Sequence, residues 1–159
     1  MKSLIVYYSY SGNTEKVANV LKDVLSKRGE TNIAALNPEN ESGNFFMQSM
    51  RAFRRKRAIL KEAPFDVARY DLICVGNPVW AFAPTPAINT YIDELKNLKS
   101  KNVACFITYG SGTGAERCLA TMRRALKEKG AFKFFSFKIQ QNKVDDEDFV
   151  RSTIEETLT

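Results

Sequence analysis

The sequence predicts a doubly wound α/β domain, in which helices cover both faces of one parallel sheet. Short apolar, β-prone runs of strand length alternate strictly with segments of helical periodicity from one end of the chain to the other. Such alternation requires right-handed crossovers, which make the strands parallel and bury them on both faces. No stretch resembles a linker, a repeat or a low-complexity tract, so we expect residues 1–159 to form a single domain.

The first half of the chain contains two of the predicted strands. Residues 4–8 are an apolar run of the length of a buried strand, and from 14 to 28 the apolar side chains fall on one face of a helix. Residues 32–36 predict a second strand, which a polar loop follows. A helix is then predicted from about 45 to 62, because its aromatic and aliphatic side chains share one side.

The second half of the chain adds three more strands, each followed by a helix. The strand-like runs are residues 71–76, 103–109 and 132–139. Pro86 opens a helix in the position that proline tolerates, and the buried stripe of this helix runs from Ile88 to Leu98. Gly130 stops the helix predicted over 116–129. The last helix begins near the acidic residues 145–148, whose charges suit the positive end of a helix dipole. The sequence thus predicts five strands and five helices.

A small, hydroxylated turn separates the first strand from the first helix and reads Ser9-Tyr10-Ser11-Gly12-Asn13-Thr14. It leaves backbone N–H groups free at a helix N-terminus, where the dipole also favours negative charge. The hydroxyl and amide side chains can add donors, which makes the turn a candidate cradle for one phosphate monoester. An ordinary N-cap is the alternative, because Ser, Asn and Thr all cap helices.

Two further loops follow the third and fourth predicted strands. Ligands of doubly wound sheets bind outside the carboxyl ends of the strands, at the switch in strand order, and both loops lie at that edge. Loop 76–86 contains the only tryptophan, Trp80, with Phe82 nearby. Loop 109–114 is rich in glycine, so its backbone can approach a flat ligand closely. Together the three loops predict a site for a planar, monophosphorylated ring system.

These residues resemble the signature of the flavodoxin-like family. Ser9-x-Ser11-Gly12-Asn13-Thr14 is similar to the family's (S/T)-x-(S/T)-G-N-T phosphate loop, and Gly76-Asn77-Pro78-Val79-Trp80 is similar to its G-x-P-x-W/Y loop. The Pro-x-Pro that follows and the helix with Tyr-Ile-Asp-Glu fit the same pattern. The resemblance covers essentially the whole chain, and it implies the strand order 2-1-3-4-5 and FMN as the cofactor.

The resemblance also implies a role for each loop. The first would hold the FMN phosphate, the second would line the isoalloxazine with Trp80 as a candidate for stacking, and the third would meet the pyrimidine edge through backbone amides. The implied cofactor-binding residues are Ser9, Tyr10, Ser11, Gly12, Asn13, Thr14, Pro78, Val79, Trp80, Ala81, Tyr109, Gly110, Ser111, Gly112 and Thr113. No catalytic side chain and no metal ligand is expected, because the redox chemistry would be the flavin's.

The sequence differs from electron-carrier flavodoxins in two respects. Those proteins are strongly acidic, whereas this chain has 24 Lys and Arg against 18 Asp and Glu, a net charge of +6. They also commonly place an aromatic residue in the loop after the fourth strand, where this chain has only Tyr109 at the strand end. Two functions stay open: an FMN-binding redox protein that mediates electron transfer, and an NAD(P)H-dependent, FMN-containing reductase of quinones or similar acceptors.

The composition excludes several other classes. The chain has no histidine, which rules out Ser-His-Asp and Cys-His catalysis and imidazole metal ligation. A signalling receiver domain needs an acidic pair after the first strand, and a low-molecular-weight phosphatase needs a Cys-x5-Arg loop there. The turn at 9–14 contains neither.

The cysteines and the hydropathy bear on the compartment. Cys74, Cys105 and Cys118 lack CxxC spacing, and we expect small buried hydrophobes rather than a disulfide framework. No apolar run approaches the roughly 20 residues needed to cross a bilayer, and no secretory n-region precedes the first strand. The sequence therefore predicts a cytoplasmic protein without membrane insertion.

A basic run lies within the helix predicted over 45–62 and comprises Arg51, Arg54, Arg55, Lys56, Arg57 and Lys61. A solvated helix surface is one interpretation. The run could also dock an acidic redox partner protein or grip the phosphates of NAD(P)H. Nucleic acid is not an expected partner, because no aromatic stacking platform is interleaved with the charges.

Overall fold

A five-stranded parallel sheet forms the centre of the computed structural model, which describes residues 1–39 and 57–159. Its strands are β1 (Lys2–Tyr7), β2 (Glu30–Ala35), β3 (Leu72–Pro78), β4 (Asn102–Tyr109) and β5 (Phe134–Gln140). They lie side by side in the order β2-β1-β3-β4-β5. All four pairings are parallel. The predicted doubly wound sheet and its strand order are confirmed.

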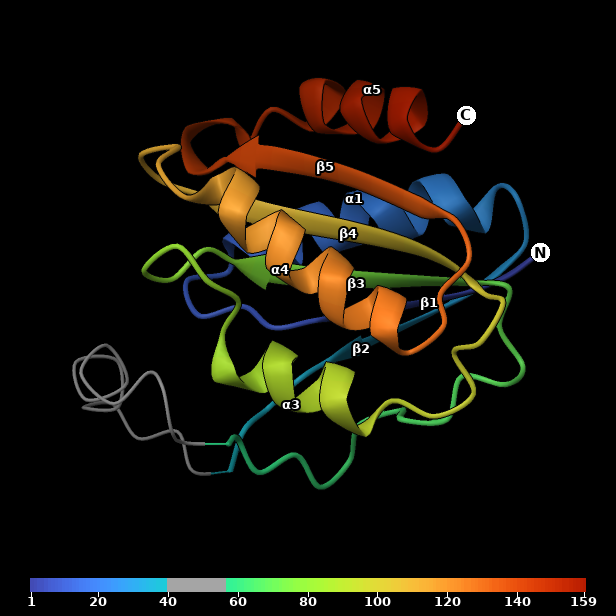
Figure 1. The fold of residues 1–159 in the computed structure, drawn as a ribbon. Helices are drawn as coiled ribbons and strands as arrows, with labels where there is room; N and C mark the ends of the chain where they lie inside the picture. The colour runs from blue at the N-terminus through green and yellow to red at the C-terminus, as the bar shows by residue number, and fades with distance from the viewer. Residues whose placement is uncertain (40–56) are drawn as a thin grey trace.

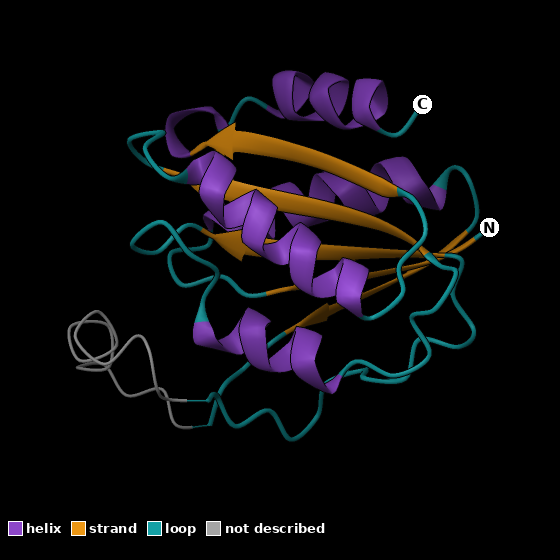
Figure 2. Ribbon diagram, viewed as in Figure 1, coloured by secondary structure: helices purple, strands orange, loops and turns teal. Residues whose placement is uncertain are grey.

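Helices cover both faces of this sheet, as Figure 1 shows. The α-helices of the described residues are α1 (Asn13–Ser26), α3 (Pro86–Glu94), α4 (Ala115–Glu128) and α5 (Glu147–Thr157). A 3-10 turn, η1 (Gln141–Lys143), follows β5. Helices α3 and α4 lie over one face and α1 and α5 over the other (Figure 2). Within the described residues, no helix is long and apolar enough to cross a membrane.

Each face of the sheet has its own hydrophobic core. One core joins the sheet to α3 and α4, with Ile73, Ile88 and Leu126 fully buried. The other joins it to α1 and α5, with Ile5 and Leu21 fully buried. The three central strands contribute to both cores because successive side chains point to opposite faces, which is why these strands are continuous apolar runs.

The helix predicted over 45–62 lies mostly outside the described residues. Its last part, 57–62, is described and is not helical, so the prediction is wrong there. Two contacts account for the difference. The backbone N–H of Ala58 donates to Thr90 Oγ1 on α3, and the carbonyl of Ile59 accepts from the N–H of Glu39. Local periodicity cannot reveal such tertiary partners, which compete with helical hydrogen bonds.

Helix α3 begins and helix α4 ends where the sequence predicts. Thr85 caps α3 by accepting from the N–H of Ile88, and Pro86 stands in the first turn. Gly130, at φ 90°, follows the end of α4. Helix α3 is shorter than its apolar stripe indicates, since it ends at Glu94 while Leu98 is still buried beyond it.

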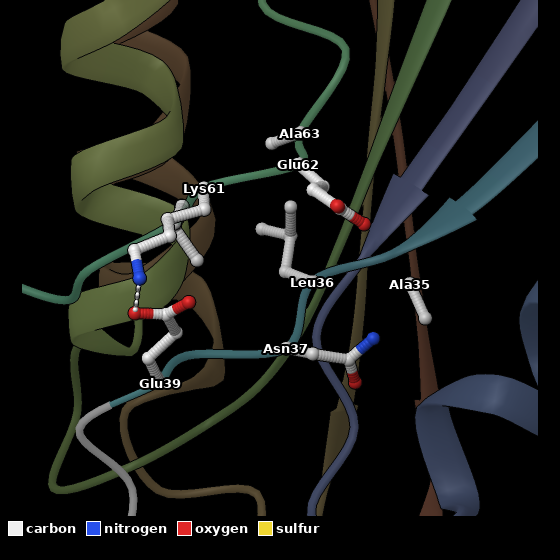
Figure 3. Close-up of a pocket in the computed structure, with 8 residues that line it drawn as sticks. Ala35, Leu36, Asn37, Glu39, Lys61, Glu62 and Ala63 are labelled. Atoms are coloured by element: carbon white, nitrogen blue, oxygen red, sulfur yellow. Dashed lines mark ion pairs between the residues drawn. The ribbon is translucent and has the colours of Figure 1, made fainter.

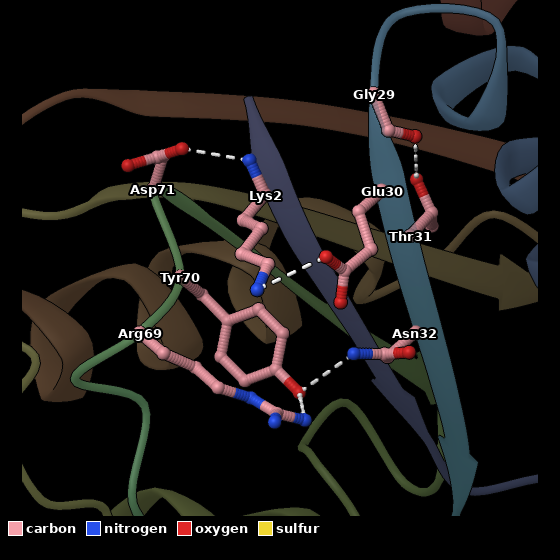
Figure 4. Close-up of polar contacts among 8 residues, drawn as sticks. All are labelled: Lys2, Gly29, Glu30, Thr31, Asn32, Arg69, Tyr70 and Asp71. Atoms are coloured by element: carbon pink, nitrogen blue, oxygen red, sulfur yellow. Dashed lines mark hydrogen bonds and ion pairs between the residues drawn. The ribbon is translucent and has the colours of Figure 1, made fainter.

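Polar contacts at the amino edge of the sheet tie the chain before β3 to β1 and β2 (Figure 4). The N–H of Lys2 donates to Asp71 Oδ2 at 2.6 Å, and Lys2 Nζ forms an ion pair with Glu30 at 3.0 Å. Asn32 Nδ2 donates to the Tyr70 hydroxyl at 3.0 Å. This cluster lies at the opposite end of the strands from the three loops that the sequence predicts to bind a ligand.

Candidate functional site

The three predicted loops meet around one cavity of about 400 Å³ at the carboxyl edge of the sheet. Nine of the sequence-predicted site residues line it: Tyr10, Ser11, Asn13, Pro78, Val79, Trp80, Tyr109, Gly110 and Ser111. Six do not, namely Ser9, Gly12, Thr14, Ala81, Gly112 and Thr113. The described residues that line the cavity carry no formal charge, so an anion there would be held by neutral donors and dipoles.

The first loop leaves backbone donors free at the start of α1. Gly12 is the N-cap residue, takes the left-handed conformation at φ 86° and provides no side-chain cap. Ser9 Oγ accepts from the N–H of Glu15 at 3.3 Å, whereas the N–H groups of residues 11–14 have no hydrogen-bond partner within the described chain. A Cβ at Gly12 would meet nothing within 4 Å. The loop therefore combines free donors with open space, and this donor set fits a phosphate group.

The side chain of Thr14 does not line the cavity, although a direct contact with the phosphate would require it to do so. Its side chain is buried, and its Oγ1 lies 2.8 Å from Thr108 Oγ1 near the end of β4. Thr108 itself lines the cavity. The hydroxyl pair thus joins the first loop to the strand that carries the third loop.

Trp80 forms one wall of the cavity and is 8% exposed. Its ring meets Tyr8 edge-on at 5.6 Å and Tyr10 edge-on at 5.9 Å between centroids. Beyond it the chain makes a tight turn, which two backbone hydrogen bonds between Trp80 and Ala83 close. Ala81 and Phe82, the central residues of this turn, have φ angles of 45° and 70°.

The conformation of that turn costs free energy, because L residues with side chains disfavour positive φ by roughly 1–2 kcal/mol each. The turn displays Phe82, a residue that is 47% exposed. Phe82 packs over Gly114, where a Cβ would lie 2.0 Å from the Phe82 Cδ1 atom. Glycine at 114 therefore makes room for an aromatic side chain beside the site.

The third loop is anchored from β5. Gln140 Nε2 donates to the carbonyl of Gly110 at 3.0 Å. The side chain of Gln141 lies against Gly110, since a Cβ there would be 3.4 Å from Gln141 Nε2. Gln141 also lines the cavity, so a fourth strand end contributes to the site.

Two residues that line the cavity, Thr108 and Gln141, are not among those that the sequence predicts. Thr108 lies inside a predicted strand rather than in a loop. Gln141 could have been found by applying the strand-end rule to the fifth strand as well as to the first, third and fourth.

A second, smaller cavity of about 210 Å³ lies beyond the carboxyl end of β2 (Figure 3). Leu36 points into it, and Glu39 forms an ion pair with Lys61 at 2.7 Å beside it. None of the sequence-predicted cofactor residues lines this cavity.

Comparison with known families agrees with this architecture. A family model described as flavodoxin matches residues 2–150. The chain belongs to the flavodoxin family. No curated protein matches the sequence.

Solved structures extend the likeness across the whole chain. A protein from Bacteroides eggerthii DSM 20697 has a TM-score of 0.77 at 19% identity, over 99% of this chain and 98% of its own. A flavoprotein from Lactobacillus acidophilus NCFM, solved in complex with FMN, has a TM-score of 0.63 at 22% identity, over 92% and 98% of the two chains. The apo form of an NADH:FMN oxidoreductase has a TM-score of 0.68 at 15% identity, over 99% and 88%. At these identities the likeness shows the fold.

Proposed function

We propose that this protein binds FMN in the cavity at the carboxyl edge of the sheet and acts as a redox protein that mediates electron transfer. The observation that carries the proposal is the meeting of the free N–H groups of residues 11–14, the Trp80 wall and the glycine-rich loop around one cavity. Membership of the flavodoxin family and the FMN complex of the Lactobacillus acidophilus relative support it. Bound FMN would supply one- and two-electron redox chemistry.

The residues of the chain would bind and orient that cofactor. Ser11, Gly12 and Asn13 offer the donors for the phosphate, and Ser9 and Thr14 hold the loop in shape through their own hydrogen bonds. Pro78, Val79 and Trp80 would border the ring system. Because Trp80 is buried between other residues, it would exclude water from one side of the ring.

The third loop would meet the ring through its backbone. Tyr109, Gly110 and Ser111 line the cavity, and the hydrogen bond from Gln140 fixes the Gly110 carbonyl. Ala81, Gly112 and Thr113 lie outside the lining, so we assign them to the shape of their loops rather than to direct contact. The cysteines are free and buried, which is consistent with the cytoplasmic location predicted from the sequence.

An NAD(P)H-dependent reductase of quinones or similar acceptors is the second candidate. The net charge of +6 suits this candidate, because a basic protein attracts an anionic dinucleotide. Two exposed aromatic side chains beside the cavity, Tyr10 and Phe82, offer apolar surface to a second planar substrate.

Two measurements test the proposal. Absorption bands near 370 and 450 nm in purified protein, or after addition of FMN to apoprotein, are the general signature of oxidised flavin and are the expected result. Failure of FMN to bind at micromolar concentration would overturn the proposal. Oxidation of NADH or NADPH by the loaded protein, with a quinone as acceptor, would separate a reductase from a carrier that needs a partner protein.

A further inference from the structure

Asn77 is a fully buried polar residue at the end of β3 that hydrogen-bonds through both ends of its carboxamide. Its Nδ2 donates to the carbonyl of Pro78 at 2.6 Å and to Cys118 Sγ at 3.5 Å. Its Oδ1 accepts from both the N–H and the hydroxyl of Thr85, each at 2.9 Å. A buried amide with these partners is costly to replace, because every partner would then lose its hydrogen bond.

The contacts of Asn77 close the loop that forms the Trp80 wall. Pro78 opens this loop and Thr85, eight residues from Asn77, ends it and caps α3. Pro78, Val79 and Trp80 line the cavity, whereas Asn77 itself does not. Asn77 therefore acts on the cavity only through the backbone that it holds.

We propose that Asn77 is the positioning residue of this loop, setting where Pro78 and Trp80 lie against the flavin ring; this inference rests on the proposed FMN function. The loop borders the ring and not the phosphate. Loss of the Asn77 contacts should therefore weaken FMN and riboflavin by the same factor. Because Trp80 is the only tryptophan, its fluorescence also reports the position of the loop in apoprotein, without any flavin.

The test uses Asn77→Leu, which keeps the size of the side chain and removes all of its hydrogen bonds. We expect the dissociation constants of FMN and riboflavin to rise by equal factors, about tenfold. In apoprotein we expect acrylamide to quench Trp80 more strongly, because the loop no longer holds it in its buried position.

A matched pair of milder variants guards against failure of Asn77→Leu to fold. Thr85→Val removes the hydroxyl that donates to Asn77 and accepts from the N–H of Ile88. Thr90→Val removes a buried hydroxyl of α3 that accepts from the N–H of Ala58 instead. Urea unfolding measures the stability lost by each. We expect Thr85→Val to shift flavin affinity and Trp80 quenching in the direction of Asn77→Leu, and Thr90→Val to shift neither.

Asn77→Leu and Thr85→Val could instead lose stability while both flavin affinities and the quenching of Trp80 match those of Thr90→Val. That result would overturn the positioning role. If the unmodified protein binds neither flavin, the proposed function fails. Acrylamide quenching of Trp80 in the apoproteins then still decides whether Asn77 holds the loop.

Discussion

Thr14 Oγ1 and Thr108 Oγ1 lie 2.8 Å apart in the interior, where they join the start of α1 to the end of β4. One hydroxyl donates to the other, so the donor of the pair has no proton left for a ligand while the acceptor keeps one. The pair holds the phosphate loop against the strand that carries the glycine-rich loop.

The first prediction concerns this pair. Thr14→Ala should weaken FMN by about 1–3 kcal/mol, because the loop loses an internal hydrogen bond and the phosphate loses support. Riboflavin, which lacks the phosphate, should be nearly unaffected. Titration of both ligands into apoprotein measures the difference. Thr121→Ala, which removes an exposed hydroxyl on α4 that donates to Arg117, is the control. Equal losses for FMN and riboflavin would show that the phosphate lies elsewhere.

The second prediction concerns Trp80. Its place in the cavity wall means that bound FMN should quench its fluorescence strongly. Trp80→Leu should weaken FMN and riboflavin alike by about 1 kcal/mol beyond the loss of buried area, as for other aromatic pairs. Fluorescence titration of the unmodified apoprotein and absorption titration of the variant measure the two effects. Unchanged emission at saturating FMN would place Trp80 outside the site.

The third prediction concerns stability at high pH. Burial raises the pKa of Cys105 and of Cys118 to about 12, from a reference value of 9.0. Burial raises the pKa of Cys74 as well. The unfolded chain therefore releases these thiol protons at lower pH than the folded chain does. The contribution of each protonated thiol to the free energy of unfolding is fully present below pH 9. It is lost as the pH rises from about 9 to about 12, by about 1.4 kcal/mol per pH unit for each thiol.

Urea unfolding between pH 8 and pH 11 under reducing conditions measures this loss. Above pH 9, Cys105→Ala should reduce the dependence of the unfolding free energy on pH by the contribution of one thiol, about 1.4 kcal/mol per pH unit. Tyr7→Phe is the control, since burial and the neighbouring Glu15 raise the pKa of Tyr7 from 10.0 to about 12 and its contribution starts only above pH 10. A slope for Cys105→Ala equal to that of the unmodified protein between pH 9 and 10 would contradict the prediction.

The fourth prediction concerns charge and redox potential. Reduction of FMN by two electrons tends to add negative charge, which a protein of net charge +6 disfavours less than an acidic one does. We expect a less negative two-electron midpoint potential than acidic flavodoxins have. Replacing Arg51, Arg54 and Arg55 by Glu should lower it, more at low than at high salt, if their charges act within a Debye length of about 8–10 Å. Spectroelectrochemical titration measures the potential. No change in potential or in NAD(P)H oxidation would assign this run to a solvated surface.

Much of the fold follows from local patterns. The apolar runs that became β1, β3 and β4 are buried on both faces, and a short, continuous apolar run is typical of a strand inside a parallel sheet. Pro86 and Gly130 mark helix ends because their backbone constraints act wherever they stand. Strict alternation of strands and helices then left one class of architecture.

The part of the fold that was predicted wrongly depends on distant contacts. Residues 57–62 have an apolar side that suits a helix, yet Thr90 and Glu39 bind their backbone. Helix α3 ends at Glu94, before Leu98, and just beyond its end the N–H of Lys96 donates to the carbonyl of Phe65. Neither partner can be inferred from the segment itself.

By itself the sequence determined the doubly wound class, the three loops at one edge and the residue types that they offer, because strand length, helix periodicity and turn chemistry act over a few residues. Only the tertiary structure decided which of those residues face the cavity. It turned Thr14 toward Thr108, brought Gln141 from the end of the fifth strand to Gly110 and placed the Asn77 amide against Cys118. These relationships join residues far apart in the chain, and strand order and packing, rather than local preference, set the distances between them.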